Sequence, residues 1–313
     1  MKKLQKFYLG VEGGATKSAA LLVNERDEVV MERRGKALNY HSGGEQQVRK
    51  NLLNLLSPIL RKTKVGKVYA VLGLAGIDTR KDEIFHRKHV RSLLPKNSTF
   101  RVVNDAESGI EAKCPGEKHR ILVIAGTGSS VYGESNRKTA KSVGWEFILG
   151  DEGSGYDVGL KIIKAAVQSW DGRSDKTLLE KSVLQHTNSR AMEDFIDKVD
   201  KVMRDERQSI KYFVASFGPL LNEALQKDDW EALRIRKEVV EELTKGVIAV
   251  VHRLHLADQE FCIGLVGSVW KMPGLKENFQ DAIKRQFPHA QFSQRTEGGE
   301  WGAVRLAKQL APH

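Results

Sequence analysis

The fold of this 313-residue chain is decided by two glycine-rich segments, Gly10-Val11-Glu12-Gly13-Gly14-Ala15-Thr16-Lys17 and Val123-Ile124-Ala125-Gly126-Thr127-Gly128-Ser129-Ser130. An apolar, β-branched run leads into each segment, at 7–11 and 121–125, and a second run follows it, at 19–23 and 130–132. This pattern predicts two β-hairpins whose turns carry few side chains. Because glycine lowers stability, such turns indicate that a ligand approaches the backbone closely.

The two turns share a chemistry that suits phosphate. Consecutive amide N–H groups beside a hydroxyl can bind phosphate oxygens. A single turn of this kind is a weak signal, since hairpins also use glycine for conformational reasons alone. Two such turns, with further motifs between and after them, predict the two halves of a phosphate clamp for a nucleotide.

Length and composition exclude several other classes. At 313 residues the chain can form two cores of about 150 residues each. No apolar run approaches the roughly 18 residues of a membrane span, and the first one, which ends at Val11, is too short for a signal peptide. We therefore expect a cytoplasmic protein with no membrane partner. Cys114 and Cys262 lack Cys-x-x-Cys spacing, which argues against a metal or iron–sulfur site built from one chain.

The formal net charge of +11 would suit a nucleic-acid partner. However, the basic residues are scattered, with only modest clusters at 33–36, 61–67 and 86–91. No basic stripe interleaved with aromatic residues accompanies them. We therefore expect a solvated surface and no binding of nucleic acid.

The expected elements occur in a repeated order. The first set comprises strands 6–11, 18–24 and 28–34, helix 45–62, strand 68–74, helix 81–94, strand 99–103 and a short helix from Ala106. The second set comprises strands near 121–125, 129–134 and 139–143, helix 156–170, strand 261–266, helix 275–286, strand 290–294 and helix 301–310. This order predicts two α/β domains of the ribonuclease H-like type, at 1–113 and 114–300, with a helical insertion at about 177–257 in the second. The C-terminal helix, 301–311, is expected to pack back on the first domain, and the strand ends of both domains to face an active-site cleft.

The motifs resemble those of the actin-like ATPase superfamily, most closely its N-acetylglucosamine kinase branch in the BadF/BadG/BcrA/BcrD ATPase family. The resemblance covers most of the chain and is carried, in the expected order, by Glu12-Gly13-Gly14-Ala15-Thr16-Lys17, Asn39-Tyr40-His41, Gly73-Leu74-Ala75-Gly76, Asn104-Asp105-Ala106, Gly126-Thr127-Gly128-Ser129, Gly144-Trp145, Leu149-Gly150-Asp151-Glu152-Gly153-Ser154 and Gly264-Leu265-Val266-Gly267-Ser268-Val269. The segment from Trp145 to Ser154 is its most specific part. The resemblance implies two ribonuclease H-like domains around a cleft, with ATP as cosubstrate.

The resemblance assigns the phosphates of ATP to the two glycine turns and the adenosine to a later pair of glycines. The residues are Gly13, Gly14, Thr16, Lys17, Gly126, Thr127, Gly128, Ser129, Gly264 and Gly267. Glu12 ends the first strand and is expected to hold Mg²⁺ through water, since Mg²⁺ keeps several waters and takes few protein ligands. An ordinary turn acid is the alternative for this residue.

Asp105 follows the apolar run 100–103. The resemblance places the general base of the sugar kinases here, and a carboxylate at the C-terminal end of a strand can accept a hydroxyl proton. The alternative is an N-cap for the helix from Ala106, and one residue can serve both roles.

The resemblance also implies a set of sugar contacts, made by Asn39, Gly76, Asp105, Trp145 and Asp151. A sugar needs polar partners for its hydroxyls and often an apolar face to rest on, which carboxylates beside an indole ring can offer. The structural alternatives are a turn Asn, a core Trp and an N-cap Asp. Glu152 either contacts the sugar or only orders its loop.

Together these residues predict an ATP-dependent kinase for the 6-hydroxyl of N-acetylglucosamine or a close amino sugar. A kinase for glucosamine or N-acetylmuramic acid is the nearest alternative. An ATPase that activates a reductase or dehydratase is another, but the cysteine spacing gives it no support. A non-catalytic sugar sensor is a third, which the presence of Glu12 and Asp105 disfavours. The sequence does not reveal the oligomeric state, and a homodimer stays an option.

Overall fold

The computed structural model describes residues 5–63, 66–77, 79–205 and 209–312, with only the backbone described at 40–43. The chain divides into two units. Unit 1 comprises residues 1–117 together with 293–313, and unit 2 comprises residues 118–292. Each unit is built on one five-stranded sheet.

The sheet of unit 1 has the strand order β3-β2-β1-β4-β5. β1 is antiparallel to β2, and β2 to β3, whereas β4 and β5 continue the sheet in parallel. The strands are β1 (Gln5–Gly13), β2 (Lys17–Asn24), β3 (Val29–Lys36), β4 (Gly66–Leu74) and β5 (Thr99–Asn104). The helices are α1 (Tyr40–Lys62), α2 (Arg80–Leu93), α3 (Asp105–Lys113) and α11 (Gly299–Gln309).

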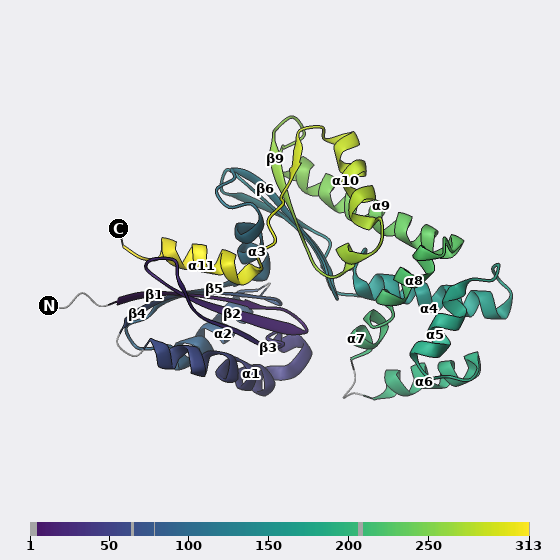
Figure 1. Ribbon diagram of the computed structural model, residues 1–313, viewed down its shortest axis with the longest axis horizontal. Helices are drawn as coiled ribbons and strands as arrows, with labels where there is room; N and C mark the ends of the chain where they lie inside the picture. Colours follow the sequence, from purple (N-terminus) through teal and green to yellow (C-terminus); the bar gives the residue numbers. More distant parts are fainter. Residues whose placement is uncertain (1–4, 64–65, 78, 206–208, 313) are drawn as a thin grey trace. The chain divides into compact units, whose positions relative to one another are not determined.

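Helices cover both faces of this sheet (Figure 1). On one face, Leu52, Leu56 and Ile59 of α1 and Val90 of α2 pack against apolar side chains of β1, β2 and β4. On the other face, the C-terminal helix α11 packs against residues of β1, β2, β4 and β5. Regular helix begins after Gly44, whose backbone angles (φ 71°, ψ 161°) are not helical, so the expected start at residue 45 is confirmed.

Unit 2 repeats the same architecture, with the strand order β10-β9-β6-β7-β8. Its strands are β6 (His119–Ala125), β7 (Ser129–Ser135), β8 (Lys138–Ser142), β9 (Phe261–Val266) and β10 (Ala290–Phe292). Its helices are α4 (Gly155–Asp171), α5 (Leu178–His186), α6 (Met192–Arg204), α7 (Ile210–Ala215), η1 (Gly218–Leu220), α8 (Leu221–Gln226), α9 (Trp230–Arg253), η2 (Val269–Lys271) and α10 (Leu275–Gln286). The predicted insertion, at about 177–257, covers the helices from α5 to α9.

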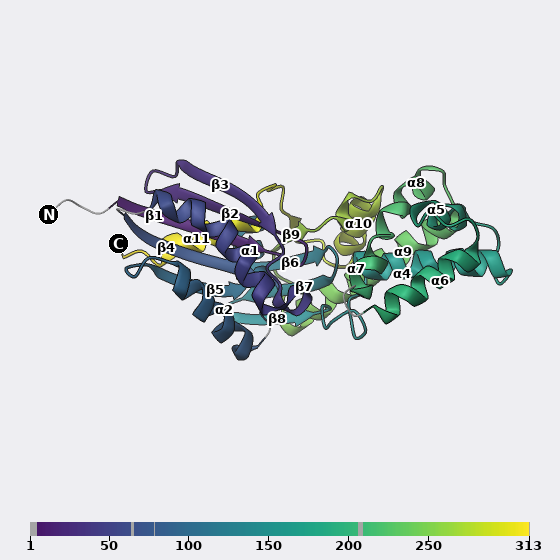
Figure 2. The same ribbon diagram turned by 90° about the horizontal axis from the view of Figure 1, so that it is seen from below.

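The insertion shares one apolar core with the sheet of unit 2. Buried side chains of α4 and α9 connect residues of β6 with Leu179, Phe195 and Phe217 of the insertion. Figure 2 shows α5, α6 and α8 grouped at one end of the unit, away from β6, β7 and β8. The predicted α/β class, with two sheets of equivalent strand order and a helical insertion in the second, is confirmed.

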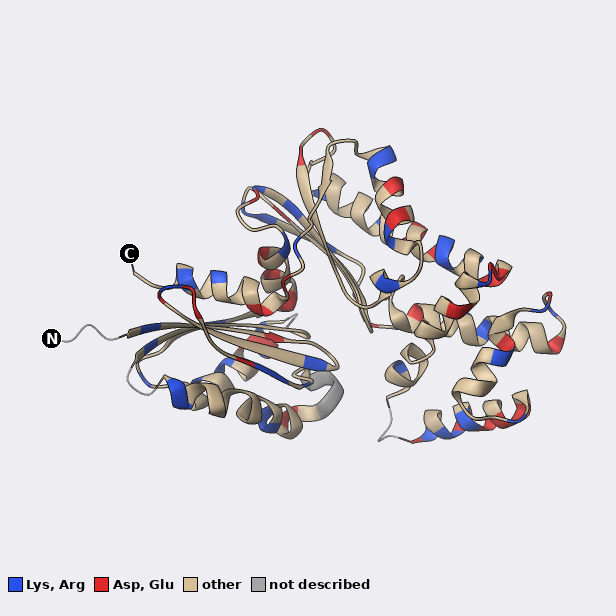
Figure 3. Cartoon of the chain, in the orientation of Figure 1, with Lys and Arg blue, Asp and Glu red and all other residues tan. Residues whose placement is uncertain are grey.

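Charge is distributed over both units without a single basic surface. In Figure 3, acidic and basic residues alternate along the outer helices, including α6, α9 and α10. This mixture agrees with the expected solvated surface. Among the described residues, none of the helices combines the length and the apolar character that crossing a bilayer requires.

The position of α11 depends on glycine. A Cβ atom on Gly10 of β1 would lie 2.1 Å from the backbone oxygen of Glu300 and 2.6 Å from the backbone nitrogen of Val304. A Cβ atom on Gly302 would lie 1.9 Å from the backbone oxygen of Ser108 in α3. The backbone of α11 therefore rests directly on β1 and α3, which only glycine at these positions permits.

Gly10→Ala should lower the free energy of unfolding by about 3 kcal/mol, the upper part of the range for overpacking, because the clash is with backbone that cannot rotate away. Urea unfolding followed by circular dichroism measures this change. Gln309→Ala, at an exposed position of α11, is the control and should leave the midpoint near that of the wild type. Equal midpoints for Gly10→Ala and the wild type would contradict the close contact.

Candidate functional site

The first glycine segment forms the expected hairpin between β1 and β2. The backbone N–H of Gly14 donates to the carbonyl of Lys17 (2.9 Å), which closes the turn. Gly13 is buried, and a Cβ atom there would lie 2.6 Å from the Cδ2 atom of Leu74. Of the residues predicted to bind phosphate in this turn, Thr16 and Lys17 are exposed, so they are available to a ligand.

Glu12 lies at the N-terminus of α11. The backbone N–H of Gly299 donates to its Oε2 atom (3.0 Å), and a negative charge at a helix N-terminus is stabilised by the helix dipole. Burial raises the pKa of Glu12 to about 7, with help from a side-chain hydrogen bond to Glu300 and from the charges of Glu300 and Asp105; the hydrogen bond from Gly299 opposes the shift. Two carboxyl groups can share a hydrogen bond only when one is protonated, so this pair favours a neutral Glu12 at low pH.

Two further ionisable residues, Glu300 and Lys113, interact with Glu12. The sequence analysis did not predict either of them. Glu300 is only 5% exposed. The Nζ atom of Lys113 donates to the backbone oxygens of Glu297 (2.7 Å) and Arg295 (2.9 Å). Burial lowers the pKa of Lys113, while the charges of Glu12, Glu297 and Glu300 raise it. In the sequence, the acidic residues at 297 and 300, on either side of two glycines, were the signal that could have indicated these contacts.

The structure shows which residue caps the helix that Asp105 begins. The N-cap of α3 is Asn104, whose side chain accepts from the backbone N–H of Ala106 (2.9 Å) and donates to the carbonyl of Ile77 (3.0 Å). Asp105 is the first residue of the helix rather than its cap. Its carboxylate therefore does not serve the capping role, and its charge acts on Glu12.

The other predicted sugar contacts of unit 1 lie in loops. Asn39 is in the connection between β3 and α1 and is partly buried. Gly76 follows β4 with a φ of 83°, which side chains rarely tolerate, so a conformational reason for glycine exists there without a ligand. Asp78 lies outside the described residues.

The second glycine turn is held by the N-terminus of α4. The backbone N–H groups of Gly155 and Tyr156 donate to the carbonyls of Gly126 (2.7 Å) and Thr127 (3.2 Å). Ser154 caps the helix by accepting from the backbone N–H of Asp157. The expected alternative of an N-cap at Asp151 is therefore not the role of that residue.

The loop from 144 to 154 wraps around the same turn. The hydroxyl of Ser129 donates to the backbone oxygen of Glu152 (2.8 Å), which ties the loop to the turn. A Cβ atom on Gly128 would lie 3.0 Å from the Oδ2 atom of Asp151, so glycine leaves room for this buried carboxylate. The Nζ atom of Lys211 in α7 lies 2.7 Å from the same Oδ2 atom. Nothing in the sequence pattern had pointed to Lys211.

Trp145 is not a core residue. Its side chain is 53% exposed, and the Nζ atom of Lys141 lies 4.8 Å from the ring centroid. This exposure removes the core alternative and is compatible with a ligand resting on the ring.

The two glycines predicted to contact the adenosine, Gly264 and Gly267, lie in β9 and just after it. Gly267 (φ 120°) follows β9, and its Cβ would lie 2.0 Å from the carbonyl oxygen of Ala125, at the start of the second glycine turn. Gly264 lies inside β9, paired with Leu122.

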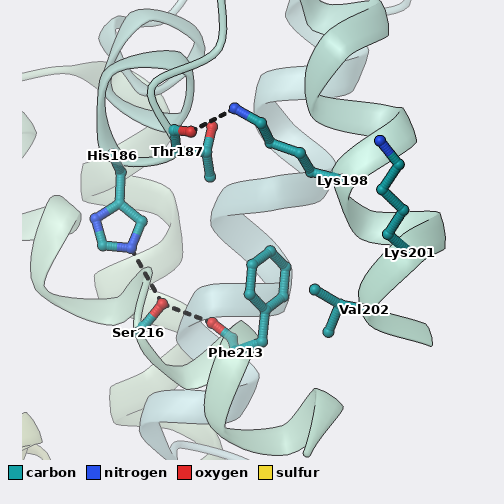
Figure 4. A pocket seen from close by; sticks show the side chains of 7 residues that line it. All are labelled: His186, Thr187, Lys198, Lys201, Val202, Phe213 and Ser216. Carbon is teal, nitrogen blue, oxygen red and sulfur yellow. Dashed lines mark hydrogen bonds between the residues drawn. The ribbon is translucent and has the colours of Figure 1, made fainter. Parts of the chain in front are cut away.

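A hollow of about 420 Å³ lies among the insertion helices, apart from these residues (Figure 4). It is lined by His186, Thr187, Lys198, Lys201, Val202, Phe213 and Ser216. Lys198 is bonded there to the carbonyl of Thr187 (2.6 Å), and His186 to the hydroxyl of Ser216 (3.1 Å). None of the predicted site residues contributes to its lining.

Comparison with known proteins identifies the chain. A model of the BadF/BadG/BcrA/BcrD ATPase family matches residues 9–305. The chain belongs to this family. An N-acetylmuramic acid/N-acetylglucosamine kinase from Clostridium acetobutylicum is 31% identical, over 97% of this chain and 98% of its own. An N-acetyl-D-glucosamine kinase from Dictyostelium discoideum is 27% identical, over 97% and 98%.

Solved structures agree on the fold of this family member. A Chromobacterium violaceum protein proposed to be an N-acetylglucosamine kinase superposes with a TM-score of 0.75 at 18% identity, over 97% of this chain and 99% of the other. A ROK family glucokinase from Streptomyces griseus gives 0.58 at 15% identity, over 97% and 98%. At such identities the likeness concerns the fold alone. Together with the sequence relatives, it confirms the predicted family, fold class and enzyme class, an ATP-dependent sugar kinase.

The carboxylate of Glu12 has the chemistry that suits a magnesium ion held mainly by water and phosphate. Within the described part of the chain, no group of three or more His, Cys, Asp or Glu side chains forms a metal site. Mg²⁺ in phosphoryl-transfer enzymes typically takes only one or two carboxylates and keeps several waters. The charge of Asp105 raises the pKa of Glu12, and a bound cation would offset the repulsion between these two carboxylates.

The raised pKa of Glu12 should make the fold less stable as the pH rises. In the unfolded chain this group loses its proton near pH 4.5, but in the folded protein only near pH 7. The folded state therefore binds more protons over this window, and its stability falls from about pH 4.5 to about pH 7. Glu12→Gln keeps an acceptor for Gly299 and removes the charge. We expect the melting temperature of Glu12→Gln to fall less than that of the wild type between about pH 5 and about pH 8. The difference should be on the order of 2–4 °C for each kcal/mol of stability that the wild type loses through ionisation of Glu12.

Differential scanning calorimetry at the two pH values measures this difference. Glu32→Gln, which removes one partner of an exposed ion pair with Arg34, is the control and should follow the wild type. The same decline in Glu12→Gln and the wild type would show that Glu12 titrates normally.

Proposed function

We propose that the protein transfers the γ-phosphoryl group of ATP to the 6-hydroxyl of N-acetylglucosamine or a close amino sugar. The observation that carries this proposal is the division of roles at the start of α3. Asn104 caps the helix, and Asp105, the first residue of α3, acts through its charge on Glu12. The kinase relatives supply the reaction class.

Asp105 is the proposed general base. Its carboxylate would accept the proton of the sugar hydroxyl as the hydroxyl oxygen forms a bond to the γ-phosphorus. The bond between that phosphorus and the bridging oxygen breaks, and ADP leaves. Little covalent work falls to the protein in such a transfer, so positioning and charge neutralisation provide most of the catalysis.

The phosphate contacts are assigned to the two glycine turns. In unit 1, the exposed Thr16 and Lys17 would supply a hydroxyl and a cation beside the backbone of Gly13 and Gly14. In unit 2, the backbone of Gly126, Thr127 and Gly128 would approach the phosphates. Gly264 and Gly267 are assigned to the adenosine. The absence of a side chain on Gly267 lets its backbone pack against Ala125, beside the second glycine turn.

Magnesium is the proposed cofactor, held by Glu12 through water. When bound, it would neutralise charge on the phosphates. The Gly299 N–H on one carboxylate oxygen fixes the orientation of Glu12. Ionised Glu12 is the form that can serve a cation, and it predominates above about pH 7 in the absence of metal.

The sugar contacts are assigned to Asn39, Gly76, Trp145 and Asp151, together with the base. The exposed ring of Trp145 offers an apolar face, and Asp151 can accept hydrogen bonds from hydroxyls. The relatives act on amino sugars by name, N-acetylmuramic acid and N-acetylglucosamine in one case and N-acetyl-D-glucosamine in another. They support an N-acetylated amino sugar.

Asp105→Asn should lower kcat by at least about a hundredfold, because the amide cannot accept the hydroxyl proton. Sugar affinity, measured by calorimetry, should change much less. Coupled assays of ADP production measure turnover. Glu107→Gln, in the first turn of the same helix, is the control and should stay near the wild-type rate. A wild-type rate in Asp105→Asn would remove the base assignment.

Glucose should be used at least about tenfold less efficiently than N-acetylglucosamine, since a site that bonds an acetamido group loses those bonds with the analogue that lacks it. The ratio of kcat/KM for the two sugars, at saturating ATP and Mg²⁺, tests this expectation. Equal values would contradict the amino-sugar assignment and leave the kinase assignment intact.

A further inference from the structure

Asp151 occupies an unusual position for a ligand-binding carboxylate. It is only 6% exposed, and its Oδ2 atom lies 3.0 Å from the place where a side chain on Gly128 would begin. The backbone N–H of Ser129 donates to its Oδ1 atom over a long 3.5 Å. The carboxylate is therefore seated against the second glycine turn with little support from backbone donors.

Lys211 supplies a positive charge at this position. Its Nζ atom lies 2.7 Å from the Oδ2 atom of Asp151 and 3.7 Å from the Oε2 atom of Glu146, with 22% of the lysine side chain exposed. The same ammonium group lies 5.7 Å from the centroid of the Phe147 ring, which packs edge-on against Tyr156 at 5.0 Å. The cation thus contacts three residues that belong to, or adjoin, the loop around the turn.

The helix that carries Lys211 is itself fixed in place. A Cβ atom on Gly159 of α4 would lie 1.9 Å from the carbonyl oxygen of Val214 in α7, so the two backbones are in direct contact. Phe213 and Phe217 pack edge to face at 5.2 Å, and Phe217 belongs to the apolar core. α4 also holds the glycine turn through Gly155. Asp151, the turn and Lys211 therefore share one rigid support.

We propose that Lys211 is a positioning residue for sugar binding, which holds the Asp151 carboxylate in a fixed direction at the second glycine turn. This inference rests on the proposed function, because it takes Asp151 as a sugar contact. A buried carboxylate without a cation is strongly disfavoured, whereas one paired at 2.7 Å can stay ionised and keep a fixed direction. The helical insertion would then set sugar affinity through a residue that does not contact the sugar.

The test compares Lys211→Met, which removes the charge but retains most of the length of the side chain, with the conservative Lys211→Arg. Lys237→Met is the matched control, because it removes one partner of an exposed pair with Glu241 in α9. We expect Lys211→Met to raise the Kd for N-acetylglucosamine by about tenfold or more, since one charge of a buried pair is left alone. The KM for ATP should change far less. Lys211→Arg should restore most of the affinity, and Lys237→Met should match the wild type.

A double-mutant cycle separates positioning from a general loss of structure. If Lys211 acts through Asp151, then Lys211→Met should add little to the loss already caused by Asp151→Asn, because the amide needs no counter-charge. Additive losses in the double variant would overturn the inference. Melting temperatures and ATP affinities identify any variant whose defect is general unfolding, and Lys211→Arg provides the comparison in that case.

The two proposals fail in different ways. Wild-type protein that binds amino sugars by calorimetry without transferring phosphate would overturn the proposed function, while the sugar Kd values of the variants would still test Lys211. Unchanged sugar affinity in Lys211→Met, with kinase activity intact in the wild type, would overturn the role of Lys211 and leave the kinase assignment standing.

Discussion

The constraint on which the candidate residues of each unit depend is the direct contact of a helix N-terminus with a strand end, made possible by glycine. In unit 2, the first N–H of α4, from Gly155, donates to the carbonyl of Gly126. In unit 1, the first N–H of α11, from Gly299, donates to the carboxylate of Glu12. The first N–H groups of a helix have no partner within the helix, so each contact satisfies a donor that would otherwise need water. Each contact also fixes a residue or turn assigned to phosphate chemistry.

Each unit also contains a carboxylate that lies beside a second ionisable side chain. Burial raises the pKa of Glu12, and its pairing with another acid, Glu300, adds to the rise. Asp151 is paired with a cation, Lys211. A buried carboxylate near another acid is held neutral over a wider pH range, whereas one near a cation is stabilised in its charged form. The first arrangement suits a group whose proton can be displaced by a cation, and the second suits a permanent acceptor for hydroxyl groups.

Much of the fold could be predicted from local pattern. The strands at 17–24, 29–36 and 261–266 lie within two residues of their expected bounds, because alternating or continuous apolar runs bounded by glycine or charge are strong local signals. The helix start after Gly44 was also predictable, since the apolar period begins there. The individual roles of polar residues were harder. Asn104 and Asp105 are adjacent and both can cap a helix, so the sequence alone could not decide which one does.

The sequence by itself determined the two glycine turns, the repeated strand order and the family, because these depend on local pattern and on motif order. Only the tertiary structure decided which charged groups meet. Lys211 is sixty positions away from Asp151 in the numbering, and Glu300 lies at the opposite end of the chain from Glu12. The acids at 297 and 300 mark a polar segment, but no local pattern shows which side chains meet. The attraction or repulsion between two side chains becomes strong only when packing brings them within a few ångströms and removes the water between them.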